Sequence, residues 1–594
     1  EPPVIKPSKQ DTQKDPTISI DGKTALLGDK VYYRVNIDAS RLTDTAYKVW
    51  RLGMTDDYDQ EYLTLDAKHV EILDETGRDR TGEFNIQDKD GVLYAFAKTV
   101  DTQIPATGET VPGDPQPDDL KAYSEKTDKD YDPLKDPSID QSLLGHTYQV
   151  VMPMTVTKVK DGHTVENTAT QVTNDKRDKT NTVTNPLKEI NPTKDVTVQV
   201  GGDSIDGKSV YLNHTFLYRL DSSILPPDRA YQTVTDWGGT DQLNTEYDQY
   251  LGNWAVYASR DLYRDGQVLA AKGEKIAGSG FDSSKFGGNL FTVDADDNGK
   301  VTADATQAYL DLVSADNEHE AGWVLYLQCK RIAVADEVPN TWTETINGQP
   351  RESNKVVTKT PDMTPSIHLE KVDTPTLKQD GQEQADRDDP KQALKMDADS
   401  IGITFIITNT SKTDPATGDG AWYKASDLNL ADSTIVGDAH VDMDSLTYPA
   451  DWDTLVLKPG ESVSVTGTLK GVKEGETHTD RAIVTGTPLV ECAPSNGDPF
   501  NDKTDGGEDT DPEYSTGDVT EIDGKQLCAD TQTASNTDDW NGYRAKPLAS
   551  TGVAVLGLAG GALAVLLAGG SLLVFRKRHY AQGSGRHTAV NAGK

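Results

Sequence analysis

An uncharged apolar run over residues 553–575 constrains this chain more than any other feature. Val, Ala, Leu and Gly make up most of it. At about 1.5 Å of rise per residue, a helix of this length spans the roughly 30 Å hydrocarbon core of a bilayer. The basic cluster at residues 576–579 follows at once, and it should stay on the cytoplasmic side. We therefore expect a single C-terminal transmembrane helix, with an exported protein in front of it.

A pentapeptide lies directly before this run. It consists of Leu548, Ala549, Ser550, Thr551 and Gly552. The pentapeptide, the run and the basic cluster together resemble a sortase sorting signal of the LPXTG class, in a variant with alanine at the second position. The resemblance implies cleavage after Thr551 and attachment of Thr551 to peptidoglycan, so that the membrane holds the protein only transiently. An ordinary single-pass anchor is the alternative. A similar segment at residues 104–108 has no apolar run behind it, and we interpret it as a loop.

The composition favours an extracellular β protein. The chain of 594 residues carries 97 acidic and 59 basic side chains, a net charge of -38. Such a charge argues against nucleic acid or an anionic membrane surface as a partner. Alternating strands rich in Thr, Val and Tyr recur with Asp-Gly turns, whereas long helical periodicity is scarce before the apolar run. The sequence therefore predicts an all-β fold of three or four domains.

Two segments repeat the same landmarks in the same order. Ser-Ile-Asp-Gly-Lys occurs at residues 19–23 and again at residues 204–208, each time with a lysine before it and a strand ending in aspartate after it. We infer two homologous domains. The boundaries that we expect are a linker at 1–5 from a missing N-terminal region, homologous domains at 6–188 and 189–363, a third domain at 364–545, and the sorting signal at 546–594.

The repeated domains resemble the C-terminal domains of antigen I/II-type surface adhesins. The residues that carry the resemblance are the two Ser-Ile-Asp-Gly-Lys segments, Trp50-Arg51-Leu52-Gly53-Met54 before Asp56-Asp57-Tyr58-Asp59, Gly91-Val92-Leu93-Tyr94-Ala95-Phe96, and Asn181-Thr182-Val183-Thr184-Asn185. The resemblance implies elaborated immunoglobulin-like β-sandwiches with long crossover loops. The third segment, with Leu457-Lys458-Pro459-Gly460-Glu461-Ser462 between alternating strands, is similar to the β-sandwich domains of bacterial surface stalks.

The family resemblance also implies intramolecular Lys–Asn isopeptide bonds. Desolvation removes the proton from a buried lysine, which becomes a nucleophile, and it keeps a nearby carboxyl group protonated so that it can polarise the asparagine amide. The assignments that we expect are Lys9, Asp38 and Asn181; Lys194, Asp221 and Asn354; and Lys371 with Asn536, for which Asp432 is the candidate acid. Asn185 is the alternative to Asn181 as the partner of Lys9. The alternative is that all of these are surface residues of an acidic protein.

The three cysteines have separate interpretations. Cys492 and Cys528 flank an acidic loop in the third domain, and pairing is the natural expectation in an exported protein. Cys329 lies in an alternating strand, which predicts a buried and inert thiol.

Calcium is a weaker expectation. Asp56, Asp57 and Asp59 form a candidate site, because related adhesin domains bind calcium and carboxylate oxygens suit the ion. Residues 294–299 imitate the start of an EF-hand loop, but Ala305 stands where a bidentate glutamate is needed, and we predict a hairpin turn. No other cofactor is expected.

The sequence as a whole favours an adhesin stalk that is secreted and covalently attached to the cell wall. We find no nucleophile elbow, Walker loop or zinc motif, and we predict no enzyme activity. The expected partners are sortase and peptidoglycan, with host or microbial surface glycoproteins as ligands. A sortase-polymerised pilin subunit and the stalk of a wall-anchored enzyme with a missing catalytic domain are the alternatives.

Overall fold

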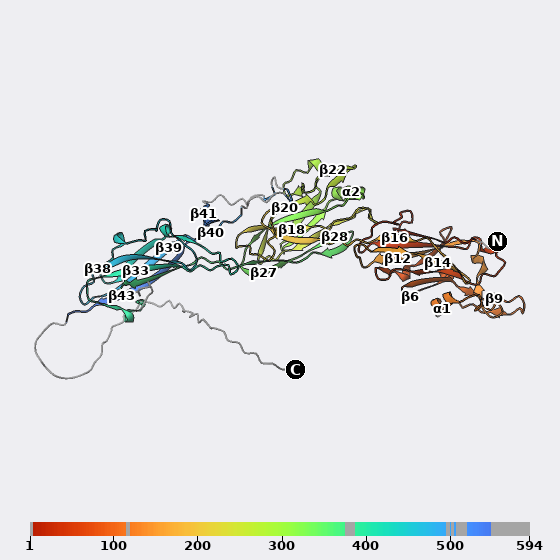
Figure 1. Cartoon of the computed structure of the whole chain (residues 1–594), viewed down its shortest axis with the longest axis horizontal. Coiled ribbons are helices and arrows are strands. Elements are labelled where there is room, and N and C mark those ends of the chain that lie inside the picture. Colours follow the sequence, from red (N-terminus) through yellow and green to blue (C-terminus); the bar gives the residue numbers. More distant parts are fainter. Residues whose placement is uncertain are drawn as a thin grey trace, which may run out of the picture.

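The chain folds into three all-β domains that follow one another along the long axis of the molecule (Figure 1). The computed structural model describes residues 4–114, 119–374, 386–494, 499–500, 504–506 and 519–547. The expected transmembrane segment and the cleavage motif at residues 548–552 lie outside these ranges. Among the helices of the described ranges, none is long and apolar enough to cross a bilayer.

The first domain is a sandwich of two five-stranded sheets. One sheet contains β1 (Ser8–Thr12), β2 (Lys30–Asp38), β12 (Thr147–Val156), β4 (Leu63–Leu65) and β5 (Glu71–Asp74). The other contains β15 (Lys176–Lys179), β14 (Ala169–Thr173), β3 (Leu52–Asp57), β7 (Val92–Ala97) and β6 (Phe84–Lys89). Alternate residues of β2, such as Val35 and Ile37, are buried between the sheets, as the two-residue period of a strand requires.

The second domain repeats this plan. Its first sheet contains β17 (Thr193–Thr197), β18 (Thr215–Asp221), β26 (Trp323–Arg331), β20 (Asp248–Ala258) and β23 (Lys275–Gly278). Its second contains β24 (Phe291–Ala295), β25 (Lys300–Ala305), β19 (Trp237–Gln242), β28 (Trp342–Ile346) and β29 (Gln349–Glu352). β24 and β25 pair as an antiparallel hairpin, which confirms the turn predicted at the EF-hand-like segment.

A short two-stranded pair completes each of these domains. In the first domain β13 (Thr164–Asn167) pairs with β16 (Val183–Pro186), and in the second β27 (Ala335–Asn340) pairs with β30 (Val356–Thr360). Each pair contains the last strand of its domain. Two short α-helices of the described residues, α1 (Leu120–Glu125) and α2 (Gln307–Ala315), lie in the long crossovers.

The third domain is a smaller sandwich of two four-stranded sheets. One contains β31 (Ile367–Asp373), β33 (Ser400–Asn409), β38 (Ser462–Lys470) and β36 (His440–Val441). The other contains β32 (Leu394–Met396), β43 (Ala534–Arg544), β39 (Thr477–Gly486) and β35 (Asn429–Val436). In all three domains the first strand lies at a sheet edge and pairs antiparallel with the next strand of its sheet.

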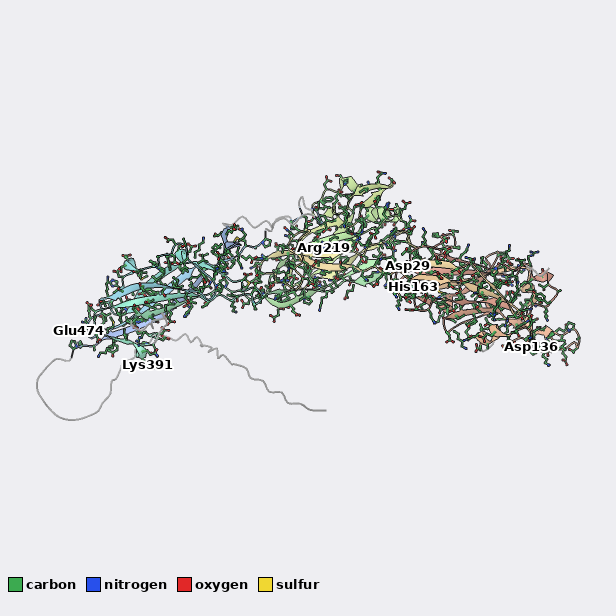
Figure 2. The ribbon with its side chains drawn as sticks, viewed as in Figure 1. Asp29, Asp136, His163, Arg219, Lys391 and Glu474 are labelled. Atoms are coloured by element: carbon green, nitrogen blue, oxygen red, sulfur yellow. A yellow bond between two sulfur atoms is a disulfide. The ribbon has the colours of Figure 1, made fainter. Side chains whose placement is uncertain are left out.

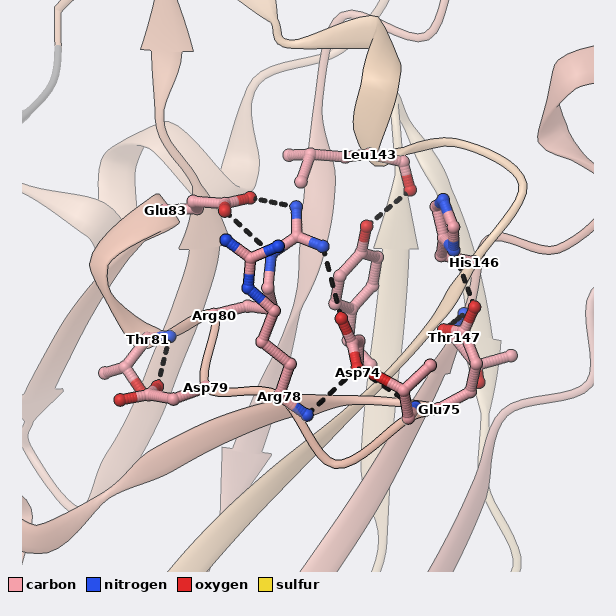
Figure 3. A network of polar contacts seen from close by, with 12 residues as sticks. Asp74, Glu75, Arg78, Asp79, Arg80, Thr81, Glu83, Leu143, His146 and Thr147 are labelled. Atoms are coloured by element: carbon pink, nitrogen blue, oxygen red, sulfur yellow. Dashed lines mark hydrogen bonds and ion pairs between the residues drawn. The ribbon is translucent and has the colours of Figure 1, made fainter.

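A ladder of charged side chains fixes the crossover after β5 in the first domain (Figure 3). Arg80 pairs with Glu83 at 2.6 Å and with Asp74 at 3.3 Å. The hydrogen bond from Thr76, together with further donors, holds the pKa of Asp74 at about 2. These contacts hold the turn after β5 against the end of that strand.

The first and second domains exchange apolar side chains at their junction. Leu26 of the first domain packs in the second core, and Ala230 of the second domain packs in the first core. Lys23 also pairs with Asp228 at 3.1 Å. Asp29, which Figure 2 labels at this junction, accepts a hydrogen bond of 2.8 Å from the backbone N–H of Leu26. The hydrophobic core of each of these two domains therefore includes a side chain from the other domain.

A segment of the third domain docks on the second. It belongs to the loop that the Cys492–Cys528 disulfide closes beside the small sheet of β40 (Leu489–Glu491), β42 (Lys525–Ala529) and β41 (Thr520–Ile522). Phe500 is 1% exposed and packs on the outer face of the β18–β26 sheet, beside Leu217 and Tyr326. Asp505 accepts a hydrogen bond of 2.5 Å from Tyr326 and lies 3.3 Å from Arg219, which Figure 2 labels. We call the described residues of this segment the strap.

We expect the substitution Phe500→Ala to loosen the strap. Removal of a buried phenylalanine side chain costs about 3 kcal/mol, which raises the open population roughly a hundredfold. Hydrogen exchange measured on peptides that contain residues 499–506 should accelerate accordingly, while peptides from β31 stay protected. Asp505→Asn, which keeps the apolar contact, should have the smaller effect. Unchanged exchange in Phe500→Ala would contradict this packing.

Candidate cross-linking sites in the three domains

Lys9 and Lys194 occupy equivalent positions on the first strands, β1 and β17. Lys9 pairs in register with Val35 and Lys194 with Leu220, and both lysine side chains are 0% exposed. Each ammonium nitrogen lies over a tyrosine ring, at 4.7 Å from the Tyr33 centroid in the first domain. The equivalent distance to Tyr218 in the second domain is 4.5 Å. Two lysines are thus fully buried, which is rare for this residue type.

A buried aspartate contacts each of these lysines from the opposite sheet. Asp56 of β3 contacts Lys9 Nζ, and Asp241 of β19 contacts Lys194 Nζ. Burial lowers the pKa of both lysines, and the charge of the partner aspartate opposes that effect. Desolvation therefore favours the neutral, nucleophilic form of each lysine.

The predicted acids Asp38 and Asp221 are not the carboxylates that these lysines contact. Asp38 accepts hydrogen bonds from the backbone N–H of Lys6 at 3.1 Å and from the Ser40 hydroxyl at 2.6 Å. Asp221 accepts two hydrogen bonds of 2.8 Å from Arg219. Both aspartates lie on the outward face of their strands, where the side chains of β2 and β18 turn away from the core.

The predicted partners Asn181 and Asn354 bind the main chain of the lysines. Asn181 Oδ1 accepts from the backbone N–H of Lys9, and Asn181 Nδ2 donates to the Lys9 carbonyl, both at 2.9 Å. Asn354 makes the same two bonds to Lys194, again at 2.9 Å. Each asparagine therefore satisfies the open edge of a first strand. The competing candidate Asn185 likewise donates to a backbone carbonyl, that of Ile20, at 2.9 Å.

A different asparagine lies in the core of each of these domains. Asn167, at the end of β13, is 1% exposed, and among the described residues its amide has no well-formed hydrogen bond. It neighbours the hydroxyl of Tyr33, the ring of which lies over Lys9 Nζ. Asn340, at the end of β27, holds the equivalent position and is 7% exposed, with an Nδ2 that lacks a partner among the described residues. Unsatisfied buried amides are uncommon and need an explanation.

Lys371 of the third domain lies between two carboxylates. Its side chain on β31 is 0% exposed, and its Nζ is 2.5 Å from Asp432 Oδ2 and 2.6 Å from Asp480 Oδ1. The sequence-based candidate acid, Asp432, is therefore in contact with the lysine. The predicted partner Asn536 instead accepts a hydrogen bond of 2.9 Å from the backbone N–H of Leu369.

The three aspartates that we expected to bind calcium do not form one site. Asp56 is buried against Lys9, Asp57 is exposed, and Asp59 lies 2.9 Å from His163. Asp56 and Asp57 are adjacent on one strand, and successive strand side chains point to opposite faces. Within the described part of the chain, the carboxylates that gather closely are those of Glu370, Asp388 and Asp538 in the third domain, within 4.8 Å of one another.

The cysteines lie where the sequence suggested. Cys492 and Cys528 are joined in a disulfide, with their Cα atoms 4.9 Å apart. Cys329 is a buried free thiol on β26. Burial raises its pKa well above the usual range, so the thiolate needed for reactivity is strongly disfavoured.

Two models of protein families match the segments that carry the Lys–Asp pairs. The model described as the cell surface antigen I/II C2 terminal domain matches residues 7–187. The model described as the cell surface antigen C-terminus matches residues 191–361. These two segments are antigen I/II-type C-terminal domains.

Relatives of known name or structure also match this chain. The aggregation substance of Enterococcus faecalis is 30% identical over 324 residues, which cover 54% of this chain and 21% of that relative. The chain therefore spans only a minor part of that relative's length. Among solved structures, the C-terminal domain of the Streptococcus pyogenes antigen I/II-family protein AspA is 21% identical, covers 60% of this chain and 100% of that chain, and has a TM-score of 0.44. That of Streptococcus agalactiae BspA is 19% identical, covers 59% and 99%, and has a TM-score of 0.43.

The sequence analysis does not identify the carboxylates that contact Lys9 and Lys194, although the sequence holds a signal for them. Asp56 follows Lys9 by 47 residues, and Asp241 follows Lys194 by the same 47. Each aspartate also follows a threonine on a strand near a tryptophan, Trp50 or Trp237. The shared spacing of 47 residues therefore marks both Lys–Asp pairs in the sequence, including Asp56, for which we predicted a calcium site.

Proposed function

We propose that this chain is the stalk region of a surface adhesin that is secreted and covalently attached to the cell wall. The antigen I/II domains and the similarity to an aggregation substance support a role at the cell surface. The sorting-signal pattern of residues 548–578 supports attachment to peptidoglycan by sortase. Host or microbial surface glycoproteins are the ligands that we propose for the complete adhesin.

An intramolecular isopeptide bond locks each antigen I/II domain in this proposal. It joins Lys9 to Asn167 and Lys194 to Asn340, with Asp56 and Asp241 as the acids. The observation that carries the proposal is the fully buried Lys–Asp contact, repeated at the same spacing of 47 residues in two domains. The buried, poorly satisfied amides of Asn167 and Asn340 supply the electrophiles.

The chemistry balances without an external reagent. The lysine passes one proton to the aspartate, and its neutral Nζ attacks Cγ of the asparagine. The protonated aspartate donates to the amide oxygen, accepts the second proton that Nζ loses and delivers it to Nδ2, and regains a proton from the oxygen as the carbonyl re-forms. The Nζ–Cγ bond forms, the Cγ–Nδ2 bond breaks, and ammonia leaves. The fold supplies the rate enhancement, because it holds the reacting groups together in a desolvated site.

Mass spectrometry tests the two bonds. Residues 1–547 should weigh less than their formula by at least one ammonia for each antigen I/II domain. Trypsin does not cleave after an acylated lysine, so the digest should contain one branched peptide that joins Lys9 to Asn167 and another that joins Lys194 to Asn340.

Matched variants separate the possible partners. Asn167→Ala should restore one ammonia of mass, whereas Asn181→Ala should leave the mass deficit unchanged. Asp56→Ala should also restore it, and Asp38→Ala should not. A branched peptide that contains Asn181 would refute the assignment of Asn167. A mass equal to the formula would refute cross-linking altogether.

A further inference from the structure

The third domain carries a buried lysine of a different kind, because it contacts two carboxyl groups, whereas Lys9 and Lys194 each contact one. Lys371 Nζ is 2.5 Å from Asp432 and 2.6 Å from Asp480. The exposed fractions of these three side chains are 0%, 2% and 0%, respectively. Among the described residues, Lys371 Nζ has no hydrogen bond to an asparagine; Asn536 and Asn541 both bind backbone groups.

The two aspartates are held differently. Asp480 on β39 has His478 beside it, with His478 Nε2 at 3.2 Å from Asp480 Oδ2. Desolvation works against ionisation of Asp480, but the contacts with His478 and Lys371 outweigh it and lower its pKa. Asp432 on the edge strand β35 shares the contact with Lys371 but not the contact with His478, and desolvation raises its pKa to about 6. Asp432 is therefore the carboxyl group that more readily keeps a proton.

The excess of negative charge around Lys371 favours a protonated carboxyl group at this site. With His478 neutral, a lysine ammonium between two carboxylates leaves one buried negative charge uncompensated, and buried charge without a partner is strongly unfavourable. One proton on Asp432 removes that charge. A carboxylic acid, unlike a carboxylate, also does not repel an approaching nucleophile electrostatically.

We propose that Lys371 and Asp432 condense to an amide, so that the third domain is cross-linked through Lys–Asp and not through Lys–Asn. This inference rests on the proposed stalk function, and it changes the partner and the leaving group in the third domain. Asp480 accepts a proton from the ammonium, and the neutral Nζ attacks Cγ of protonated Asp432. Asp480 then gives this proton to the departing hydroxyl and accepts the second proton that Nζ loses as the amide forms, so that Asp480 ends protonated. The Nζ–Cγ bond forms, one Cγ–O bond breaks, and water leaves; no oxidation or reduction is involved.

The new bond would join opposite edges of the sandwich. β31 is an edge strand of the first sheet, and β35 is an edge strand of the second. His478 does not touch the reacting atoms, and it is a positioning residue that holds Asp480 as the proton acceptor. The cross-link would therefore fasten the two sheets across the core that contains Phe405 and Trp540.

Peptide mapping of the full chain tests this inference. After tryptic digestion, we expect a branched peptide in which Lys371 is joined to Asp432, lighter than the sum of its parts by one water. The peptides of the first two domains are read in the same digest, so failure here and failure of the Lys–Asn bonds are distinguishable. A peptide that ends at Lys371 would overturn the proposal, and so would a branch to Asp480 or to Asn536.

Two variants test the roles of the aspartates. Asp432→Asn keeps an electrophile, and we expect it to cross-link with loss of ammonia in place of water. Asp480→Asn removes the proton acceptor, and the branched peptide should decrease at least tenfold. Circular dichroism verifies that each variant is folded. A full yield of the branched peptide in folded Asp480→Asn would exclude Asp480 as the proton shuttle.

Discussion

Replacement of Asn167 by alanine should lower the melting temperature of the first domain by about 10–20 °C. By analogy with a disulfide, closure of a loop that contains most of a domain stabilises it by about 5 kcal/mol. A domain of this size loses roughly 2–4 °C for each kcal/mol. The substitution removes only the electrophile and leaves the buried pair of Lys9 and Asp56 intact, so the shift reports on the cross-link. Scanning calorimetry of residues 1–547 measures it.

Two further substitutions, one in the second domain and one in the first, are the controls for this prediction. Asn340→Ala should produce the same shift in the second domain. Asn181→Ala removes two hydrogen bonds to the Lys9 backbone, each worth about 1 kcal/mol, and its shift should be the smaller one. If Asn181→Ala has the larger effect and Asn167→Ala almost none, then Asn181 is the cross-linked residue and the original sequence prediction stands.

Replacement of Thr551 by alanine should move almost all of the protein out of the cell-wall fraction. In the proposed sorting signal, Thr551 is the residue that becomes joined to peptidoglycan, so its loss leaves no acyl group for transfer. We expect the protein to remain in the membrane fraction, because the uncharged run at residues 553–575 still inserts. Fractionation of cells into wall, membrane and medium, followed by immunoblotting, measures the distribution.

The chain provides a matched control for the sorting experiment. Thr107 occupies the same place in Ile104-Pro105-Ala106-Thr107-Gly108, a segment without an apolar run behind it. Thr107→Ala should leave the wall fraction unchanged. Persistence of the Thr551→Ala protein in the wall would remove sortase attachment from the proposal. Ladders of high molecular mass in the wild-type wall extract would favour a polymerised pilin instead.

The fold was largely accessible from sequence because its signals are local. Strand alternation and turn residues indicated an all-β chain, and the repeated landmarks indicated two equivalent domains. Lys9 and Lys194 could also be found, because their offsets from the repeated motif agree. Alternation along the strand could have excluded Asp38 and Asp221 too, since each lies on the face opposite to the buried residue that precedes it, Ile37 or Leu220.

The choice among asparagines could not be made from sequence. Asn181 lies beside Lys9 in space as well, and it binds the lysine backbone. Asn167 differs only in that its amide enters the core near Tyr33, which depends on how β13 packs against the sandwich. The two carboxyl groups beside Lys371 come from strands that are distant in sequence, and only the arrangement of the sheets brings them together.

The strap has a consequence for how far the molecule can reach. Two β-sandwiches joined by a single linker bend freely, and a projecting arm with such a joint folds back under fluid flow. Here Phe500 and Asp505 belong to the third domain but sit on the second, so bending at this joint must first pull an aromatic ring out of its apolar contacts. The strap therefore resists bending between the second and third domains. In the proposed wall-attached protein, such a joint would hold the second and third domains in one orientation.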